Sequence, residues 1–423
     1  MRLIHTADLH IGKTVNEFSL IEDQQYFLRQ IIELVEREHA DGLLIAGDVY
    51  DRSIPSAEAV TLLDGFLSEL IQRKVPVLMI SGNHDSPERV GFAGKILEKE
   101  GLYIASNPLE GAKCVTLTKS VPQNGEGSTG GEEPVKNLSK STKARLEQVH
   151  IVLMPYVKPS VLGVKTNQEA VERMLKKVEE EHPELQEMDA CKILMTHYFV
   201  TNAGKEPELS DSETTVNVGG LDNVEASVFA GYDYVALGHI HKPQQIGEQQ
   251  IYYAGTPMKY SFSETNQEKG VNLICMEEKT ENKYMTENSE LMEKNERTGK
   301  VSVTRLPLTL LHDMRKITGR LEELIAPEVV QAADSSDYIQ ATLSNEEELI
   351  DPIGTLRSVY PNTMQLILAK NNIQGRGIDV THIQKSKTIL ELYEEFYQIV
   401  RGETLPEDRR KIVLQIVKEE ENI

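Results

Sequence analysis

The sequence contains little cysteine, and the cysteines it has form no pattern. Its 423 residues include three, Cys114, Cys191 and Cys275, which are far apart and include no CxxC pair. An odd and scattered set excludes a disulfide framework and is typical of a reducing compartment. We therefore expect a cytoplasmic protein.

Long apolar runs are also missing. No stretch approaches the roughly 20 apolar residues that a membrane-spanning helix needs, so we expect no association with a membrane. The first residues, "MRLIHTADLH", pass from a strand pattern directly to polar residues and lack the apolar segment of a secretory signal. A hydrophobic content of 39% and a charged content of 26% fit a soluble globular protein, and the length predicts two or three domains.

Basic residues are fewer than acidic ones, with 45 Lys and Arg against 67 Asp and Glu, so the formal net charge is −22. A protein that holds DNA alone usually presents a basic face, since neutralising phosphates supplies much of the affinity. The net charge therefore argues against DNA binding by the isolated chain. Bound divalent cations or a basic partner subunit can change the local field without changing this count.

Short apolar runs alternate with amphipathic helix patterns. This alternation predicts an α/β fold whose sheet is covered by helices on both faces. Ser56 is a candidate N-cap for the second helix, because Val60 and Leu63 then follow at helical spacing. The expected strands are 1–7, 42–47, 75–80, 149–156, 191–199, 232–241, 250–257 and 270–276, and the expected helices are 22–39, one from about 56, 88–98 and 168–181.

Two polar stretches interrupt this pattern. Residues 119–148 are dominated by Gly, Ser, Pro and charge, which indicates a surface insertion or a mobile loop. Residues 277–300 are also polar and indicate a linker or an extended hairpin. We therefore expect a first domain over residues 1–276, joined through 277–300 to the rest of the chain.

The remaining residues predict a smaller unit and a helical tail. Residues 301–372 have a compact α/β pattern, with a helix expected near 314–325. Residues 380–423 predict two amphipathic helices, of which the second begins with a capping-box signal at Thr404 and Glu407. The apolar stripes of these helices are compatible with docking to a partner, with intramolecular packing or with dimerisation.

Polar side chains follow the expected strands at the points where those strands end. "DLH" places Asp8 and His10 two residues apart, so that both can face one point. Because ligands bind at the carboxyl ends of strands in open α/β sheets, we expect these groups to lie close together. The full set is Asp8, His10, Asp48, Asn83, His84, Asp85, His197, His239 and His241, carried by "DLH", "GDVYD", "GNHD", "THY" and "GHIH".

The residue types in this set indicate a hydrolytic metal site. Imidazole, carboxylate and amide oxygen are ligands of divalent metals, and two such cations can hold a phosphate and activate a shared water. The absence of cysteine argues against a structural zinc site. Taken singly, Asp8 could cap a helix and His197 could be a structural histidine, whereas the five motifs in this order favour catalysis. The other histidines, His5, His39, His150, His182, His312 and His382, have no such context and receive no role.

The five motifs resemble the signature of the calcineurin-like metallophosphoesterases over about residues 1–276. The resemblance implies a β-sandwich flanked by helices in four α-β-β-α layers. It also implies that His84 is the catalytic histidine, which protonates the leaving oxygen, and that Asp85 orients or polarises it. One metal would be held by Asp8, His10, Asp48 and His241, the second would be completed by Asn83, His197 and His239, and Asp48 would bridge them.

Two features define what this resemblance leaves open. Manganese is the metal that the family implies, although the ligand types alone also allow iron or zinc. Some relatives carry a histidine three residues after the bridging aspartate. In this sequence that position is Asp51, so the role of that histidine is not carried over.

The segments "VGGLDNVEASVF" (218–229) and "YYAGTP" are similar to the nuclease subunits of a bacterial DNA-repair complex. This implies a manganese-dependent double-strand exonuclease and single-strand or hairpin endonuclease, with 301–372 as a capping domain beside the DNA. It also implies that 380–423 dock on an ABC-type coiled-coil ATPase, in a heterotetramer with two copies of each subunit. The partner would then supply basic DNA-binding surface.

Two alternatives remain open at this point. A phosphodiesterase or phosphatase acting on small molecules or proteins would share the same catalytic core, but it has less need of the residues beyond 276. A catalytically silent scaffold for an ATPase would not need every expected ligand together with His84. The site residues do not separate the first alternative from a DNA nuclease, whereas the residues beyond 276 favour the nuclease.

Overall fold

The computed structural model describes residues 1–122, 144–187, 191–213, 222–276, 301–347 and 349–369, together with a few single positions beyond residue 396. Two compact units are distinguished, one made of Met1–Leu343 with Leu349–Ile367 and the other of Ser344–Glu348 with Leu368–Ile423. The helices expected over 380–423 lie outside the described residues, apart from those single positions.

The first sheet contains six strands in the order β16-β15-β1-β4-β5-β6. Strands β1, β4, β5 and β6 are parallel, whereas β15 runs antiparallel to β1 and to β16. Alternate residues of β4 enter different cores, with Leu43 and Ile45 on the helix side and Leu44 and Ala46 on the other. The bounds are β1 Arg2–Thr6, β4 Gly42–Ala46, β5 Val77–Ile80, β6 Leu102–Ala105, β15 Gly270–Met276 and β16 Val301–Pro307.

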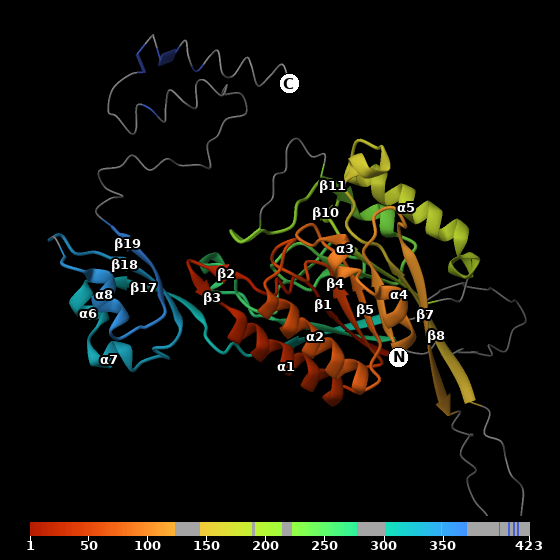
Figure 1. The fold of residues 1–423 in the computed structure, drawn as a ribbon, viewed down its shortest axis with the longest axis horizontal. Helices are drawn as coiled ribbons and strands as arrows, with labels where there is room; N and C mark the ends of the chain where they lie inside the picture. The colour runs from red at the N-terminus through yellow and green to blue at the C-terminus, as the bar shows by residue number, and fades with distance from the viewer. Residues whose placement is uncertain are drawn as a thin grey trace, which may run out of the picture. The chain divides into compact units, whose positions relative to one another are not determined.

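Two long helices, α1 (Ile21–Arg37) and α2 (Ala57–Gln72), cover one face of this sheet (Figure 1). Phe27 of α1 and Phe66 of α2 are buried in the same apolar core as the helix-facing strand residues. The prediction that Ser56 caps α2 is confirmed, because its side chain accepts a hydrogen bond from the Ala59 amide at 3.2 Å.

The second sheet also contains six strands, in the order β13-β14-β12-β9-β8-β7, and α5 (Asn167–Glu181) packs on its outer face. Its other face packs against the first sheet, in a core that includes Leu78 of β5 and Ile151 of β8. The predicted four-layer α-β-β-α sandwich is therefore confirmed. The bounds are β7 Lys113–Pro122, β8 Ala144–Leu153, β9 Cys191–His197, β12 Tyr234–Gly238, β13 Gln244–Gln245 and β14 Ile251–Tyr253.

Two local expectations for the first domain were wrong. Residues 119–122 and 144–148 belong to the antiparallel β7–β8 pair rather than to a loop, and 123–143 lie outside the described residues. The helix expected over 88–98 is divided into α3 (Pro87–Val90) and α4 (Gly94–Leu97), because Ala93 adopts a left-handed φ of 58° between them.

The three-stranded sheet β17-β18-β19 lies within the first compact unit except for Leu368, and β17 and β18 are parallel. Together with the short helices that pack on it, this sheet is called the small unit below. The helix expected near 314–325 is wrong over 314–319, where β17 alternates in burial as a strand does, and only Leu321–Leu324 is helical. The strand at 301–307 pairs with β15 and so belongs to the first sheet. The bounds are β17 Met314–Gly319, α6 Leu321–Leu324, α7 Pro327–Val330, β18 Tyr338–Leu343, α8 Pro352–Arg357 and β19 Thr363–Leu368.

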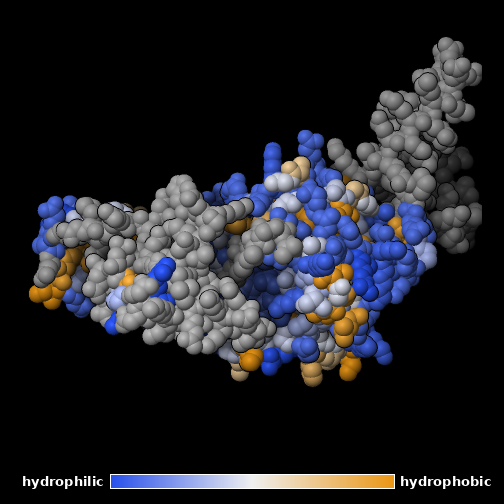
Figure 2. Space-filling model, turned by 90° about the horizontal axis from the view of Figure 1, so that it is seen from above, coloured by the Kyte–Doolittle hydropathy of each residue, from blue (hydrophilic) through white to orange (hydrophobic). Residues whose placement is uncertain are grey.

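Four short strands and five 3-10 turns complete the described chain. Their bounds are β2 Thr14–Val15, β3 Phe18–Ser19, β10 Phe199–Thr201, β11 Asn223–Glu225, η1 Glu98–Glu100, η2 Pro159–Leu162, η3 Pro183–Gln186, η4 Ala226–Phe229 and η5 Phe262–Glu264. Hydrophilic side chains predominate on the face drawn in Figure 2, where apolar ones form small groups. No helix among the described residues has the length and apolar character needed to cross a membrane.

Candidate metal centre

The predicted site residues gather where strands of the two sheets end. Asp8, Asp48 and Asn83 follow the parallel strands β1, β4 and β5, whereas His197 ends β9 and His239 follows β12. The two sheets approach closely here, since a Cβ added to Gly238 would collide with the Ala46 carbonyl oxygen. Glycine at this position thus lets the histidines of one sheet reach the carboxylates of the other.

The backbone is strained at four of the seven predicted ligands. L-residues rarely adopt a positive φ outside turns, and such strain persists where the surrounding structure imposes it, often at functional sites. The values are 53° at Asp8, 44° at His10, 48° at Asp48 and 100° at His239.

A first group of ligands consists of Asp8, His10 and His241, whose ligand atoms lie within 4.8 Å of one another. The Nε2 atoms of His10 and His241 are 3.1 Å apart. Burial lowers the pKa of His10 to about 3 and lowers that of His241 well below its usual value. Both imidazoles are therefore neutral at pH 7, the state in which a ring nitrogen can bind a metal.

A chain of polar groups fixes the ring of His241. Ser212 donates its hydroxyl proton to Glu264 at 2.5 Å, so its oxygen accepts the Nδ1 proton of His241 at 2.7 Å. Lys269 pairs with Glu264 at 2.5 Å, and both side chains are fully buried. This arrangement leaves the Nε2 lone pair of His241 for a metal, as partners of metal-binding histidines commonly do.

The second group consists of Asn83, His197 and His239. The Asn83 side-chain oxygen is 3.0 Å from His197 Nε2 and 3.0 Å from His239 Nδ1. His197 donates its Nδ1 proton to the Ala46 carbonyl at 2.9 Å, so Nε2 faces Asn83. Three side chains from two sheets thus converge on one point.

Asp48 lies between the two groups. Its Oδ2 atom is 3.7 Å from His10 Nε2 and 3.4 Å from His197 Nε2. Despite the opposing effect of burial, His197 lowers the pKa of Asp48 well below its usual value. Burial likewise opposes charge on His197, but Asp48 raises the pKa of that imidazole to about 9. This position between both groups is the one a bridging carboxylate requires.

The residues present fit two divalent cations. Asp8 Oδ2 is buried without a hydrogen-bond partner among the described residues, which is costly unless a ligand satisfies it. Burial raises the pKa of Asp8, with Asp48 adding to the rise, and a cation would relieve that repulsion. Oxygen and imidazole donors without thiolate suit metals such as manganese, iron and zinc.

His84 is held beside this centre by backbone contacts. Its amide donates to Asp48 Oδ1 at 2.9 Å, and its Nδ1 atom is 3.1 Å from the Asp51 carbonyl oxygen. When Nδ1 carries the proton, Nε2 is left to exchange a proton with a substrate. The rings of His84 and His10 are 5.0 Å apart, so the histidine lies next to the predicted metal ligands.

Asp85 contacts backbone rather than the His84 ring among the described contacts. Its carboxylate accepts hydrogen bonds from the amides of Val49, Tyr50 and Gly82 at 2.9 to 3.1 Å. Burial raises the pKa of Asp85 to about 6. Any influence of Asp85 on His84 is therefore exerted through the position of the loops that it joins.

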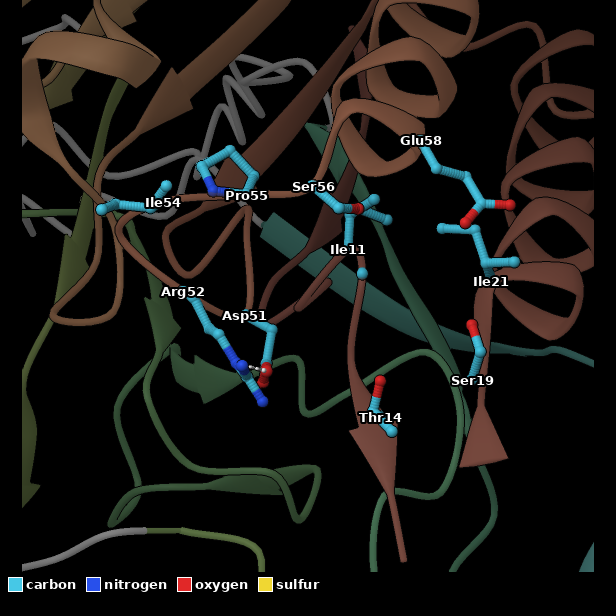
Figure 3. A pocket seen from close by; sticks show the side chains of 11 residues that line it. Ile11, Thr14, Ser19, Ile21, Asp51, Arg52, Ile54, Pro55, Ser56 and Glu58 are labelled. Atoms are coloured by element: carbon cyan, nitrogen blue, oxygen red, sulfur yellow. Dashed lines mark ion pairs between the residues drawn. The ribbon is translucent and has the colours of Figure 1, made fainter. Parts of the chain in front are cut away.

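Asp51 and Arg52 line a cavity of about 370 Å³ near the centre (Figure 3). Asp51 pairs with Lys13 at 2.6 Å and with Arg52 at 3.5 Å, and its Oδ1 atom is 3.7 Å from His10 Nδ1. Arg52 remains 74% exposed. At the position where some relatives carry histidine, this chain has Asp51, whose carboxylate pairs with the basic side chains of Lys13 and Arg52.

Sequence reasoning missed Ser212, Glu213, Glu264 and Lys269. Glu213 accepts the His241 amide at 2.6 Å, and burial raises the pKa of its carboxyl to about 7. None of these residues ends a strand of either large sheet, so the strand-end pattern did not point to them.

The structure and the comparisons define the class of protein. The family model of the calcineurin-like phosphoesterases matches residues 1–243, and the chain belongs to that family. Its members use a dinuclear metal site, so the chain is a metal-binding phosphoester hydrolase by family. A second model, SbcD_C, described as the type 5 capsule protein repressor C-terminal domain, matches residues 310–401. The chain is thus a metallophosphoesterase that resembles SbcD.

Solved structures of low identity also match the chain. GAP50, the anchor in the inner membrane complex of Plasmodium, is 11% identical with a TM-score of 0.36, over 65% of this chain and 80% of its own. A dimetal phosphatase from Danio rerio is 13% identical with a TM-score of 0.33, over 65% of this chain and 92% of its own.

Proposed function

We propose that this chain is an SbcD-type DNA nuclease that hydrolyses phosphodiester bonds with two manganese ions. The observation that carries the proposal is the placement of Asp48 between two ligand groups, with His84 alongside. The match of residues 310–401 to the SbcD_C model supports a nuclease over other phosphoesterases.

The roles follow from the contacts in the site. Asp8, His10, Asp48 and His241 would hold one metal, and Asn83, His197 and His239 would complete the second, with Asp48 shared. When bound, the two ions would hold the phosphate, lower the pKa of a water and stabilise charge in the transition state. His84, fixed through Nδ1 to the Asp51 carbonyl, would protonate the leaving oxygen from Nε2.

The proposal extends to a partner and a compartment. It is that the chain acts in the cytoplasm with SbcC, an ABC-type coiled-coil ATPase, as two copies of each subunit in DNA repair, recombination and the processing of replication hairpins. The β17-β18-β19 unit, which lies within the expected 301–372, would be the capping domain beside the DNA, and 380–423 would dock on SbcC. With a net charge of −22 on this chain, SbcC would supply much of the basic surface that binds DNA.

A nuclease assay tests the reaction. Purified protein with manganese should cleave linear duplex and hairpin DNA more efficiently than a small phosphodiester, and a chelator should abolish cleavage. His84→Ala should lower the rate by roughly 10²–10⁴-fold, as loss of a general acid does. His39→Asn is the matched control, since His39 is exposed at the end of α1 and asparagine tolerates its left-handed φ. Preference for the small substrate would favour a phosphodiesterase of the same family instead.

A pull-down tests the partner. A chain lacking 380–423 should retain manganese binding but should not be captured by immobilised SbcC. Capture equal to that of the full chain would contradict the docking role.

A further inference from the structure

Cys114, His182 and Glu184 form a cluster on the outer face of the second sheet, separate from the dinuclear centre. Cys114 lies on β7, an edge strand of that sheet, whereas His182 follows the last turn of α5 and Glu184 lies in η3. Their ligand atoms all lie within 4.8 Å of one another. Because 68 positions separate Cys114 from His182, tertiary packing rather than local sequence brings the thiol to the other two.

The imidazole and the carboxylate are already paired. His182 Nδ1 lies 2.9 Å from Glu184 Oε1. The backbone amide of Glu184 and the His182 ring lower the pKa of the carboxyl, so that it is ionised at neutral pH. The hydrogen bond between His182 and Glu184 is complete without Cys114. It therefore does not explain why the thiol lies next to this pair.

Cys114 is a poor nucleophile in the absence of a cation. Burial, and then the Glu184 charge, raise the pKa of its thiol to about 11, and a protonated thiol is unreactive. A divalent cation inverts this effect, because a coordinated thiol is deprotonated outright. The same carboxylate that disfavours a free thiolate would then share a metal with it.

Polar groups around the cluster suit a bound ion. The Tyr232 hydroxyl is buried without a hydrogen-bond partner among the described residues. Burial, and then the charges of Glu179 and Cys114, raise the pKa of that hydroxyl. His150, on the neighbouring strand β8, lies close enough to Glu184 to lower its pKa.

We propose that Cys114, His182 and Glu184 form a mononuclear zinc site with three protein ligands and an open fourth position. Zinc accepts sulfur, nitrogen and oxygen donors in one tetrahedral site, and thiolate favours it over manganese. On binding, the S–H bond of Cys114 breaks, its proton goes to solvent and a sulfur–zinc bond forms without any change of oxidation state. The bound ion would tie the edge strand β7 to the end of α5.

Cobalt(II) substitution tests the proposal on the full chain after removal of metals. The dinuclear centre contains no cysteine, so a thiolate-to-cobalt charge-transfer band in the near ultraviolet can arise only at a cysteine site. We expect the band in the natural protein and in Cys191→Ser and Cys275→Ser, and we expect zinc to displace it. Cys114→Ser should abolish it, and His182→Ala should weaken cobalt binding by roughly tenfold or more.

Three outcomes would overturn the site: no band in the natural protein, a band that survives Cys114→Ser, or equal affinity in His182→Ala. His182 is about one-third exposed, so its replacement keeps the test valid if the cysteine variant fails to fold. The proposal is independent of the nuclease reaction. Asp48→Asn should lose cleavage and keep the band, whereas His182→Ala should lose affinity for cobalt and keep cleavage.

Discussion

The metal centre and the small β17-β18-β19 unit differ in backbone conformation and in how their buried side chains are satisfied. At the centre, four ligands have left-handed backbone, and Asp8 Oδ2 is buried without a hydrogen-bond partner among the described residues. The small unit has an apolar core that includes Ile339, Leu356 and Tyr360. Its one non-glycine residue with positive φ among the described residues, Asp351, caps α8. Strained backbone is thus concentrated at the predicted metal ligands, whereas the small unit is stabilised by regular apolar packing.

The largest effect is expected from a substitution that abolishes metal-dependent cleavage and leaves the protein folded. Asp48→Asn should lower DNA cleavage by about 10³-fold or more, because the shared ligand of both metals is lost. The free energy of unfolding in chelator should change little, since removing repulsion with Asp8 offsets the lost pairing with His197. Cleavage assays and urea denaturation measure the two quantities. Normal cleavage by this variant would contradict the bridging role.

A smaller effect is expected from the group that supports His241. Ser212→Ala removes the acceptor of the Nδ1 proton, which should weaken manganese binding by roughly 10–100-fold. Excess manganese should restore much of the activity, and Ser212→Thr, which keeps the hydroxyl, should stay close to the natural protein. Manganese titrations of activity measure the shift. Unchanged affinity in the alanine variant would show that Ser212 does not position the ring.

A substitution in the core of the small unit should lower the stability of the protein and leave metal binding unchanged. Leu356 is fully buried, so Leu356→Ala should lower the free energy of unfolding by about 2–5 kcal/mol. Manganese affinity should remain within about twofold of the natural value, because no ligand contacts that core. Thermal or urea unfolding, with a manganese titration alongside, tests both parts. If manganese affinity fell by as much free energy as stability did, the small unit and the metal centre would be energetically coupled, which would contradict the prediction.

The smallest effect concerns a buried histidine that is not a predicted ligand. Burial, and then Arg305, lower the pKa of His5 to about 3, and His5 Nδ1 lies 2.8 Å from the Tyr234 hydroxyl. The unfolded chain binds this proton near pH 6.5, so the contribution of His5 to stability is present above that pH and is lost as the pH falls toward 3. His5→Gln should flatten this part of the stability profile, measured by urea denaturation from pH 7 to 4. An unchanged slope would show that His5 does not titrate on unfolding.

The sequence pointed to the residues that the structure brings together at the candidate centre, because each of these residues lies at or just after the end of a strand. Asp8, Asp48 and Asn83 follow strands of one sheet, and His197 and His239 lie at the ends of strands in the other. Ser212 and Glu264 escape this rule, since they come from a loop and from η5 and reach the site only through tertiary packing.

The errors in the fold have equally local causes. Over Met314–Gly319, lysine and arginine gave the stretch a helix-like composition, although burial alternates along it and it pairs with β18. The composition of 119–148 predicts a surface insertion or a mobile loop, whereas β7 and β8 extend into both of its ends. In each case pairing with a distant strand outweighed local preference.

Gly238 limits which residues this chain can carry between the two halves of the metal centre. With no room for a methyl group against the Ala46 carbonyl, the gap between the two halves of the centre is fixed by main-chain atoms that no side-chain exchange can adjust. A single added carbon at this point would push the two ligand groups apart.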